Sequence, residues 1–192
     1  MLTRLGIGAK KAERVLMTAS SEQKNKALEA IAKALIENTS YITENNNIDI
    51  DNAKANGMSE SMIDRLSLNA DRIKAISDAV LQVASLDDPC GKVVSGTKRP
   101  NGLMIEKVTV PLGVIAVIFE ARPNVTVDAA ALCLKSGNCV ILRGGKEAIN
   151  SNKAMTAIMR DAIAKAGLPE DCIQLVEDTS RDSAVALMKM ND

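Results

Sequence analysis

Three short apolar runs separated by helical patterns are the feature of this sequence that most restricts its fold. The runs are VIAVIF (114–119), CVIL (139–142) and CIQLV (172–176), and all three follow Pro111. Continuous runs of bulky apolar residues are typical of strands that are covered on both faces. Strands that alternate with helices favour right-handed crossovers and a parallel sheet. We therefore expect an α/β fold with a doubly wound parallel sheet.

The segments between these runs carry signals for helix ends. Pro123 suits the first turn of a helix, and Gly137 is placed to end that helix in the left-handed conformation. A second helix is expected over about 150–166, and a third after residue 176, capped by Asp178 or Thr179. Three parallel strands make half of a dinucleotide-binding sheet. We therefore expect the sheet to be incomplete in this chain, and the chain to be a fragment.

Helical patterns fill the chain before residue 88. Ser20 followed by Gln23 is the start of a capping box, and Asn69 is placed to cap a later helix. Between them an Asn-rich stretch indicates an amphiphilic helix that ends at Gly57. The apolar stripe of the first of these helices consists of Leu28, Ile31, Ala32, Leu35 and Ile36.

A hairpin is expected between the helices and the sheet. Pro89 and Gly91 interrupt the helical pattern, and Asn101-Gly102 is a strong turn signal between two strands. The second strand, LMIEKVTV, does not show one buried face, which favours an edge or a position between subunits. The sequence thus divides into a helical segment (1–88), a hairpin of the oligomerisation type (89–110) and half of a nucleotide-binding domain (111–192).

Composition excludes several classes of function. Lys and Arg total 24, as do Asp and Glu, and the only aromatic residues are Tyr41 and Phe119. A nucleic-acid-binding protein would show a basic excess or aromatic stacking faces, so no nucleic-acid partner is expected. There is no histidine, and the four cysteines are scattered, so no metal site is expected. The lack of a membrane-length apolar run or a signal-peptide layout predicts a cytoplasmic location without a membrane partner.

The loop after the second apolar run, RGGKEA (143–148), is a candidate phosphate site. The P-loop pattern fails because Val140 replaces its first glycine and Glu147 replaces its hydroxyl residue. The Rossmann fingerprint fails as well, since no glycine follows the first strand. The loop nevertheless lies at the carboxyl end of a strand, beside the crevice where open α/β sheets bind ligands. It is either a nucleotide contact or a plain turn with two solvated cations.

Four motifs in order resolve this ambiguity through a resemblance. They are PLGV (111–114), IFEARPNVT (118–126), ALCLKSGN (131–138) and LRGGKEA (142–148). On these motifs the chain resembles the γ-glutamyl phosphate reductases, a family of the aldehyde dehydrogenase superfamily. The resemblance implies an aldehyde-dehydrogenase-like fold and an NADPH-dependent reduction of L-glutamate 5-phosphate to glutamate 5-semialdehyde with release of phosphate, a step of proline biosynthesis.

The resemblance also assigns roles to residues around the cofactor. Arg143 would lie over the adenine ribose. Lys146 stands where NAD-preferring relatives often carry glutamate, and it would suit the 2′-phosphate of NADP. The flexible backbone of Gly144 and Gly145 would approach the cofactor. Thr179 and Ser180 would contact the pyrophosphate, although ordinary helix capping explains these two residues equally well.

The turn after the first strand supplies the expected substrate residues. Arg122 would hold the acyl phosphate, because a guanidinium matches phosphate oxygens. Asn124 would donate to a developing oxyanion. The alternative is a helix start in which Asn124 only satisfies free N–H groups.

The family's nucleophilic cysteine is not recognised in this chain. No cysteine stands in the expected CNA-type context, and core packing explains most of them; they are Cys90, Cys133, Cys139 and Cys172. The nucleophile is therefore expected downstream of Asp192, and this chain is expected to be inactive alone. Alternatives are another acyl-reducing aldehyde dehydrogenase, such as a CoA-acylating one, and a non-catalytic nucleotide-binding or assembly module. A homo-oligomer formed through the hairpin is expected.

Overall fold

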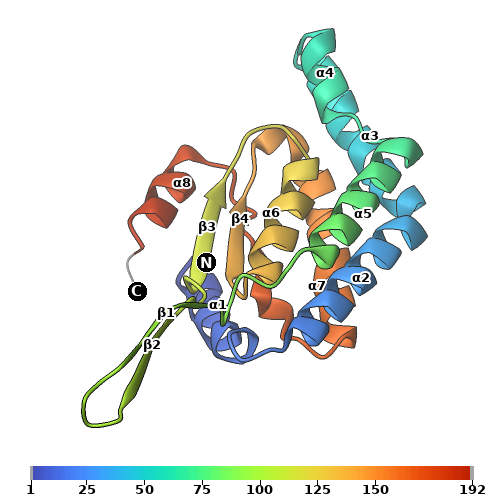
Figure 1. The fold of residues 1–192 in the computed structure, drawn as a ribbon. Coiled ribbons are helices and arrows are strands. Elements are labelled where there is room, and N and C mark those ends of the chain that lie inside the picture. Colours follow the sequence, from blue (N-terminus) through green and yellow to red (C-terminus); the bar gives the residue numbers. More distant parts are fainter. Residues whose placement is uncertain (1, 191–192) are drawn as a thin grey trace.

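A computed structural model describes residues 2–190 as a parallel sheet between layers of helices (Figure 1). The helices are α1 (Leu2–Leu16), α2 (Ser21–Glu37), α3 (Thr39–Ala55), α4 (Glu60–Leu66), α5 (Ala70–Ser85), α6 (Asn124–Lys135), α7 (Ile149–Lys165) and α8 (Arg181–Met188). The strands are β1 (Val93–Lys98), β2 (Met104–Val108), β3 (Val114–Ile118), β4 (Cys139–Arg143) and β5 (Ile173–Leu175). Two short 3-10 turns, η1 (Lys146–Ala148) and η2 (Glu170–Cys172), precede α7 and β5.

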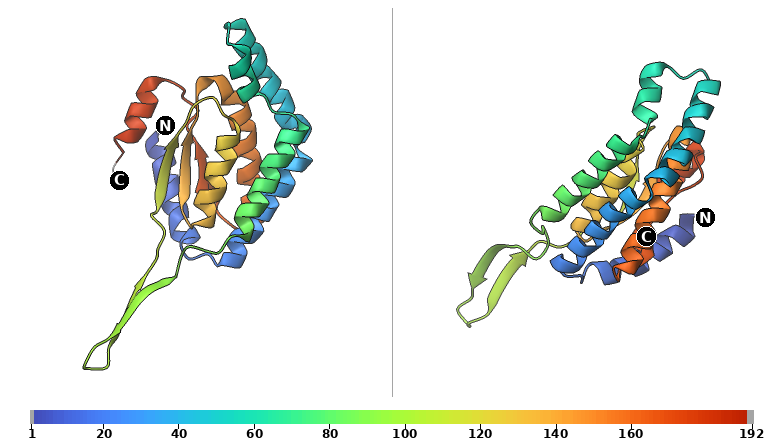
Figure 2. Two further views of the ribbon diagram at one scale, coloured as in Figure 1. Left: turned by 45° about the horizontal axis from the view of Figure 1, so that its top comes forward. Right: turned by 90° about the vertical axis from the view of Figure 1, so that its right-hand side faces the viewer.

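The three apolar runs form the parallel sheet that the sequence predicted. The strand order is β3-β4-β5, with Val114 opposite Cys139 and Val140 opposite Ile173. Helices α6 and α7 cover one face of the sheet, α1 and α8 lie on the other, and α2 and α5 form a further layer outside α6 and α7 (Figure 2). The α/β prediction is confirmed, and one hydrophobic core extends through both the helical segment and the sheet.

The prediction that β3 is covered on both faces is wrong. Only the central strand β4 is almost entirely buried, whereas Ala116 and Ile118 of β3 are exposed, Ile118 by 42%. The reason is position, because β3 is an edge strand among the described residues. A continuous apolar run identifies a strand without saying whether it lies at the centre or at the edge of the sheet.

Helices α2 and α5 begin where the sequence predicted. The Ser20 hydroxyl accepts the Gln23 N–H at 3.1 Å, and Asn69 Oδ1 accepts the Arg72 N–H at 2.8 Å, so each caps its helix. Four members of the predicted stripe on α2 are buried, and Ile36 is exposed. These caps and this stripe orient the helical layer against α6 and α7.

One local prediction is wrong, and one helix was not predicted. Helix α8 is capped by Ser180, whose hydroxyl accepts the Ser183 N–H at 3.2 Å, and not by Asp178 or Thr179. Asp178 instead accepts the Ser180 N–H at 2.9 Å, two residues further along the chain and before α8 begins. The short helix α4 had no counterpart in the prediction, because its seven residues are too few to show a helical period.

The hairpin forms as predicted and projects away from the body of the molecule, at the end opposite to α3 and α4 (Figures 1 and 2). Strands β1 and β2 pair antiparallel, with Lys98 opposite Met104, and every residue in them is exposed. The turn is longer than the Asn-Gly signal suggests: the Arg99 N–H donates to the Leu103 carbonyl at 2.8 Å, and Gly102 takes a φ of 89°. The hairpin therefore contributes its whole apolar surface to the exterior.

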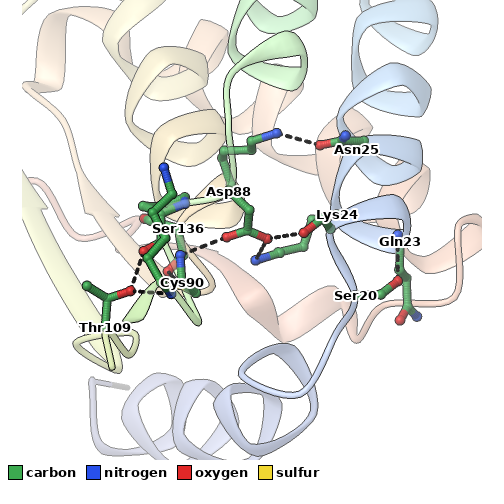
Figure 3. A network of polar contacts seen from close by, with 12 residues as sticks. Ser20, Gln23, Lys24, Asn25, Asp88, Cys90, Thr109 and Ser136 are labelled. Atoms are coloured by element: carbon green, nitrogen blue, oxygen red, sulfur yellow. Dashed lines mark hydrogen bonds and ion pairs between the residues drawn. The ribbon is translucent and has the colours of Figure 1, made fainter. Parts of the chain in front are cut away.

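A polar network fixes the base of the hairpin to the helical layer (Figure 3). The ammonium group of Lys24, whose side chain is only 3% exposed, lies 2.5 Å from Asp88 Oδ2. Ser21 also donates to Asp88 Oδ2, at 2.6 Å, and the Cys90 N–H donates to Asp88 Oδ1 at 2.9 Å. Burial alone would raise the Asp88 pKa, but the bonds from Lys24 and Ser21 outweigh it and lower the pKa to about 2. Asp88 is therefore a charged anchor.

None of the helices in the described range 2–190 combines the length and the apolar character needed to cross a membrane.

Candidate functional site

The predicted site residues gather at the carboxyl edge of the parallel sheet. Three connections leave the strands there, namely β3–α6, β4–η1 and β5–α8 (Figure 1). Parallel strands place these connections at one edge, which is where open α/β sheets bind ligands. The predicted residues in these connections are Arg122, Asn124, Arg143, Gly144, Gly145, Lys146, Thr179 and Ser180.

The glycine pair is packed against the protein itself. Both glycines are buried and neither has a positive φ. A Cβ on Gly144 would overlap the Asn152 side-chain amide and lie 3.0 Å from the Phe119 ring. A Cβ on Gly145 would lie 2.6 Å from Glu147 Oε2. The structure thus gives the pair a packing role beside the β3–α6 turn, and its contact with a cofactor stays a prediction.

The first turn of α7, which follows the glycine loop, is capped by Asp49 of α3. Asp49 Oδ2 accepts the Ser151 N–H at 2.8 Å and the Ser151 hydroxyl at 2.6 Å. Asp49 Oδ1 accepts the Asn150 N–H at 3.1 Å and its side-chain N–H at 2.8 Å. A carboxylate at a helix N-terminus satisfies free N–H groups and complements the helix dipole. The place where a phosphate would bind in a P-loop protein is therefore filled by a protein carboxylate.

Sequence reasoning missed Asp49, the residue that caps α7. Helix α3 turns one narrow stripe inward, and half of that stripe is polar; its members are Ile42, Asn46, Asp49 and Ala53. Asn46 binds the Leu66 carbonyl and the Leu68 N–H, and it donates to the Ser151 hydroxyl. These four residues have the helical spacing of four, three and four positions. The sequence did not reveal the stripe, because two of its members are polar. The stripe joins α3 to α4 and α7.

Arg143 connects the end of β4 to the start of α8. Its Nη2 donates to the Thr179 carbonyl at 2.6 Å and to the Ser180 carbonyl at 2.8 Å. Its Nε is buried without a hydrogen-bond partner among the described residues. Arg143 therefore holds the β5–α8 connection in place. The expected position of Arg143 over the adenine ribose stays a prediction. Pyrophosphate binding by Thr179 and Ser180 also stays a prediction.

Lys146 is the freer cation of the loop. It is exposed at the start of η1, and its ammonium group makes no hydrogen bond or ion pair within residues 2–190. It lines a hollow of about 670 Å³ between the loop and the α3–α4 region, with Asn52, Met58 and Met62 on the opposite wall. The geometry leaves this charge available to a ligand.

Asn124 is oriented by a neighbour one turn along α6. Its Nδ2 donates to Asp128 Oδ2 at 2.9 Å, and no side-chain bond caps the helix. The alternative role, in which Asn124 satisfies free N–H groups at the helix start, is therefore not what the structure shows. Burial raises the Asp128 pKa, and the bond from Asn124 opposes that rise. Asn124 and Arg122 line a common hollow of about 310 Å³.

None of the four cysteines resembles an activated nucleophile. Burial raises the pKa of Cys133 to about 11, and a bond with Cys172, followed by burial, raises the pKa of Cys139. Cys139 and Cys172 are both fully buried. Cys90 donates to the Ser136 carbonyl at 3.2 Å at the base of the hairpin, and burial raises its pKa. Cys90 lies near the amino end of β4, through its bond to Ser136, whereas Arg122 and Lys146 follow the carboxyl ends of β3 and β4.

Within residues 2–190, no three side chains of the His, Cys, Asp or Glu type are arranged to hold a metal ion.

Comparison with curated proteins finds relatives with one shared name. The chain is 53% identical over 187 residues to the γ-glutamyl phosphate reductase of Bacillus cereus (strain AH187), covering 97% of this chain and 45% of that protein. It is 54% identical over 184 residues to the γ-glutamyl phosphate reductase of Clostridium novyi, covering 96% and 44%. The chain therefore spans a little under half the length of these curated relatives.

Solved structures agree with the sequence comparison. The γ-glutamyl phosphate reductase of Thermotoga maritima superposes with a TM-score of 0.97 at 40% identity, covering 98% of this chain and 46% of that one. The Saccharomyces cerevisiae enzyme superposes with a TM-score of 0.86 at 38% identity, covering 93% and 47%. The sequence model described as the aldehyde dehydrogenase family matches residues 7–192. The predicted resemblance is confirmed, and this chain belongs to the aldehyde dehydrogenase family.

Proposed function

We propose that this chain forms the nucleotide-binding part of an enzyme that reduces L-glutamate 5-phosphate to glutamate 5-semialdehyde with NADPH and releases phosphate, in proline biosynthesis. The observation that carries the proposal is 53% identity to a γ-glutamyl phosphate reductase along 97% of the chain. The cations at the carboxyl edge of the sheet support it, because both the substrate and the cofactor are anionic.

The residues at the glycine loop fit a nicotinamide dinucleotide that carries a 2′-phosphate. The exposed ammonium of Lys146 has no protein partner in residues 2–190, while Arg143 is fixed by two carbonyls and so presents a rigid wall. Lys146 would pair with the 2′-phosphate, and Arg143 would support the ribose. The bound cofactor supplies the hydride. Gly144, Gly145, Thr179 and Ser180 complete the proposed cofactor contacts.

Asn124 is proposed to bind the acyl oxygen of the substrate. A side-chain amide has two N–H donors, and only one of them is used by Asp128. The second is free to donate to the oxygen as it gains negative charge, and a preorganised donor of this kind favours the reaction. Asp128 acts as a positioning residue, since its bond fixes the direction of the amide. Arg122, which lines the same hollow, is proposed to hold the phosphate.

The thiol that attacks the acyl carbon is proposed to come from outside residues 1–192. The four cysteines present are buried or half-buried, and three of them have a raised pKa. A thiol with a raised pKa is rarely in the nucleophilic thiolate form. We accordingly propose that the 192-residue chain has no reductase activity by itself. Reduced thiols also suit the cytoplasm, which is the proposed location.

The hairpin is proposed to pair with a second copy of the chain. Its exposed apolar residues include Val93, Val94, Leu103, Met104 and Ile105, each at least 50% exposed. Contiguous exposed apolar surface of this kind marks interaction sites. Unpaired outer edges of β1 and β2 are also available for pairing with another strand.

The test of the proposed activity uses the reaction in reverse. The enzyme that contains this chain is incubated with glutamate 5-semialdehyde, NADP and inorganic phosphate, and NADPH is followed by its absorbance. We expect NADPH to form only when phosphate is present, because phosphate becomes part of the acyl product. Oxidation that proceeds at the same rate without phosphate, or that requires coenzyme A, would contradict the proposed substrate.

A further inference from the structure

Two adjacent hollows beside the β3–α6 turn share a pair of arginines. One hollow has a volume of about 310 Å³ and the other about 340 Å³, and both are lined by Arg65 of α4 and Arg122 of the turn. Asn124, the proposed donor to the acyl oxygen, lines the first hollow. Phe119 and Val125 line the second. Arg65 of α4 thus lies beside the predicted substrate residues Arg122 and Asn124, although more than 50 positions separate it from them in the sequence.

The position of Arg65 is fixed by bonds to its neighbours on both sides. Arg72 binds the carboxylate of Asp64 at 2.7 Å and also donates to the Asp64 carbonyl, just before Arg65. Leu66, just after Arg65, is fully buried, and its carbonyl accepts Asn46 Nδ2 at 2.8 Å. The backbone that carries Arg65 is therefore anchored, although its side chain is exposed.

The charge around these hollows is unbalanced. The first hollow, of about 310 Å³, is lined by three arginines. Among the described residues its single acid is Asp64, which Arg72 already binds. Arg65 and Arg122 make no hydrogen bond or ion pair through their side chains within residues 2–190. The acid that lines the second hollow is Glu120. Both guanidinium groups are exposed and have no partner within residues 2–190, so both are available to bind an anion in these hollows.

We propose that Arg65 and Arg122 together form a phosphate-binding subsite. This inference rests on the proposed function, which supplies the ligand: the acyl phosphate of the substrate and the phosphate that leaves. A dianion beside Asn124 places its oxygens within reach of groups that line the same hollow. Two guanidinium groups bind it with charge-assisted, bidentate bonds. Arg65 is thereby a specificity-determining residue that selects an acyl phosphate over an uncharged acyl donor.

The first experiment measures binding of inorganic phosphate to the 192-residue chain by ³¹P NMR titration. Arg65→Gln is expected to weaken binding by about tenfold to a hundredfold, the value of one charge-assisted bond. Arg65→Lys should retain part of the affinity, since it keeps the charge and loses the fork geometry. The matched control is Arg99→Gln in the exposed hairpin turn, which should leave binding unchanged. Equal binding by the wild type and Arg65→Gln would overturn the proposal, as would absence of phosphate binding by the wild type.

The second experiment separates this inference from the proposed function. In the reverse reaction of the enzyme that contains this chain, Arg65→Gln should raise the KM for phosphate by a similar factor and leave the KM for NADP unchanged. A rise only in the KM for glutamate 5-semialdehyde would assign Arg65 to the substrate's carboxylate and overturn the phosphate assignment. If the enzyme lacks the reaction while phosphate binding to the chain still depends on Arg65, the proposed function fails and the anion subsite stands.

Discussion

Asp49 on α3 binds Ser151 at the start of α7 through two hydrogen bonds, at 2.8 Å to its N–H and at 2.6 Å to its hydroxyl. Both residues are buried. The helix that follows the glycine loop therefore depends on a carboxylate from a distant part of the chain.

Asp49→Ala is expected to destabilise the chain by about 2–4 kcal/mol, because it leaves buried N–H groups of α7 without acceptors. The measurement is urea unfolding of the 192-residue chain, followed by circular dichroism. Asp51→Ala, an exposed position on the same helix, serves as the control and should change stability by less than about 0.5 kcal/mol. Equal losses for the two variants would contradict the capping role.

Gly144→Ala is expected to destabilise the chain by about 1–3 kcal/mol, since a new Cβ would overlap the Asn152 amide and press on Phe119. Thermal unfolding measures the effect. Gly96→Ala is the matched control, because a Cβ there would meet Glu106 Cγ at an ordinary 3.8 Å. A neutral result at Gly144 would show that the pair is kept for a reason other than packing.

Acid should weaken the base of the hairpin through Asp88. Its folded-state pKa of about 2 lies below the ordinary value of 3.8, so its charged form stabilises the fold above about pH 4. That stabilisation, on the order of 2 kcal/mol, is lost as the pH falls from 3.8 to 2. Urea unfolding at several values between pH 2 and pH 6 measures the free energy of unfolding. This free energy should depend less on pH for Asp88→Asn than for the wild type. Asp87→Asn, at a side chain that is 94% exposed, should leave the pH dependence of the free energy of unfolding unchanged.

Lys146→Glu is expected to weaken NADPH binding by about tenfold to a hundredfold while affecting NADH much less, because only NADPH carries the 2′-phosphate. Fluorescence titration of both cofactors with the enzyme that contains this chain measures the difference. Lys107→Glu in the exposed strand β2 is the control for the change in net charge. Equal effects on the two cofactors would refute the role of Lys146.

Replacing apolar hairpin residues by acids should dissociate the proposed oligomer. Met104→Glu and Ile105→Glu place a charge on side chains that are 60% and 50% exposed, so the monomer should tolerate both. Sedimentation velocity measures the mass in solution. Ile48→Glu makes the same change on α3, where the side chain is also 50% exposed, and should not change the mass. An unchanged mass for both hairpin variants would exclude the hairpin as the interface.

The parts of the fold that could be predicted are those with a local signal. The helix caps at Ser20 and Asn69 and the left-handed Gly137 follow from side-chain chemistry within a few residues, and all three are present in the structure. The burial of β3 could not be predicted, because an apolar run carries no information about neighbouring strands. The capping of α8 by Ser180 was missed because three adjacent residues offered similar oxygens.

The candidate site was predictable in its position and less so in its contacts. The alternation of strands and helices placed Arg122 and Lys146 at one edge of the sheet, as a parallel topology requires. The bonds from Arg143 to two carbonyls 36 and 37 residues away have no local signal. The same holds for α4 and Arg65, whose approach to Arg122 depends on how α3 and α5 pack. Non-local contacts decided these details.

The bonds of Asp49 to Asn150 and Ser151 span 101 and 102 residues of the chain. During synthesis α3 therefore leaves the ribosome long before the helix that it caps, and the loop with Lys146 cannot take its final shape until both are present. Contacts of such long range are formed late and at a high entropic cost. We therefore expect the helical segment and the glycine loop (143–148) to fold as one cooperative unit, so that a variant that unfolds α3 would also unfold this loop.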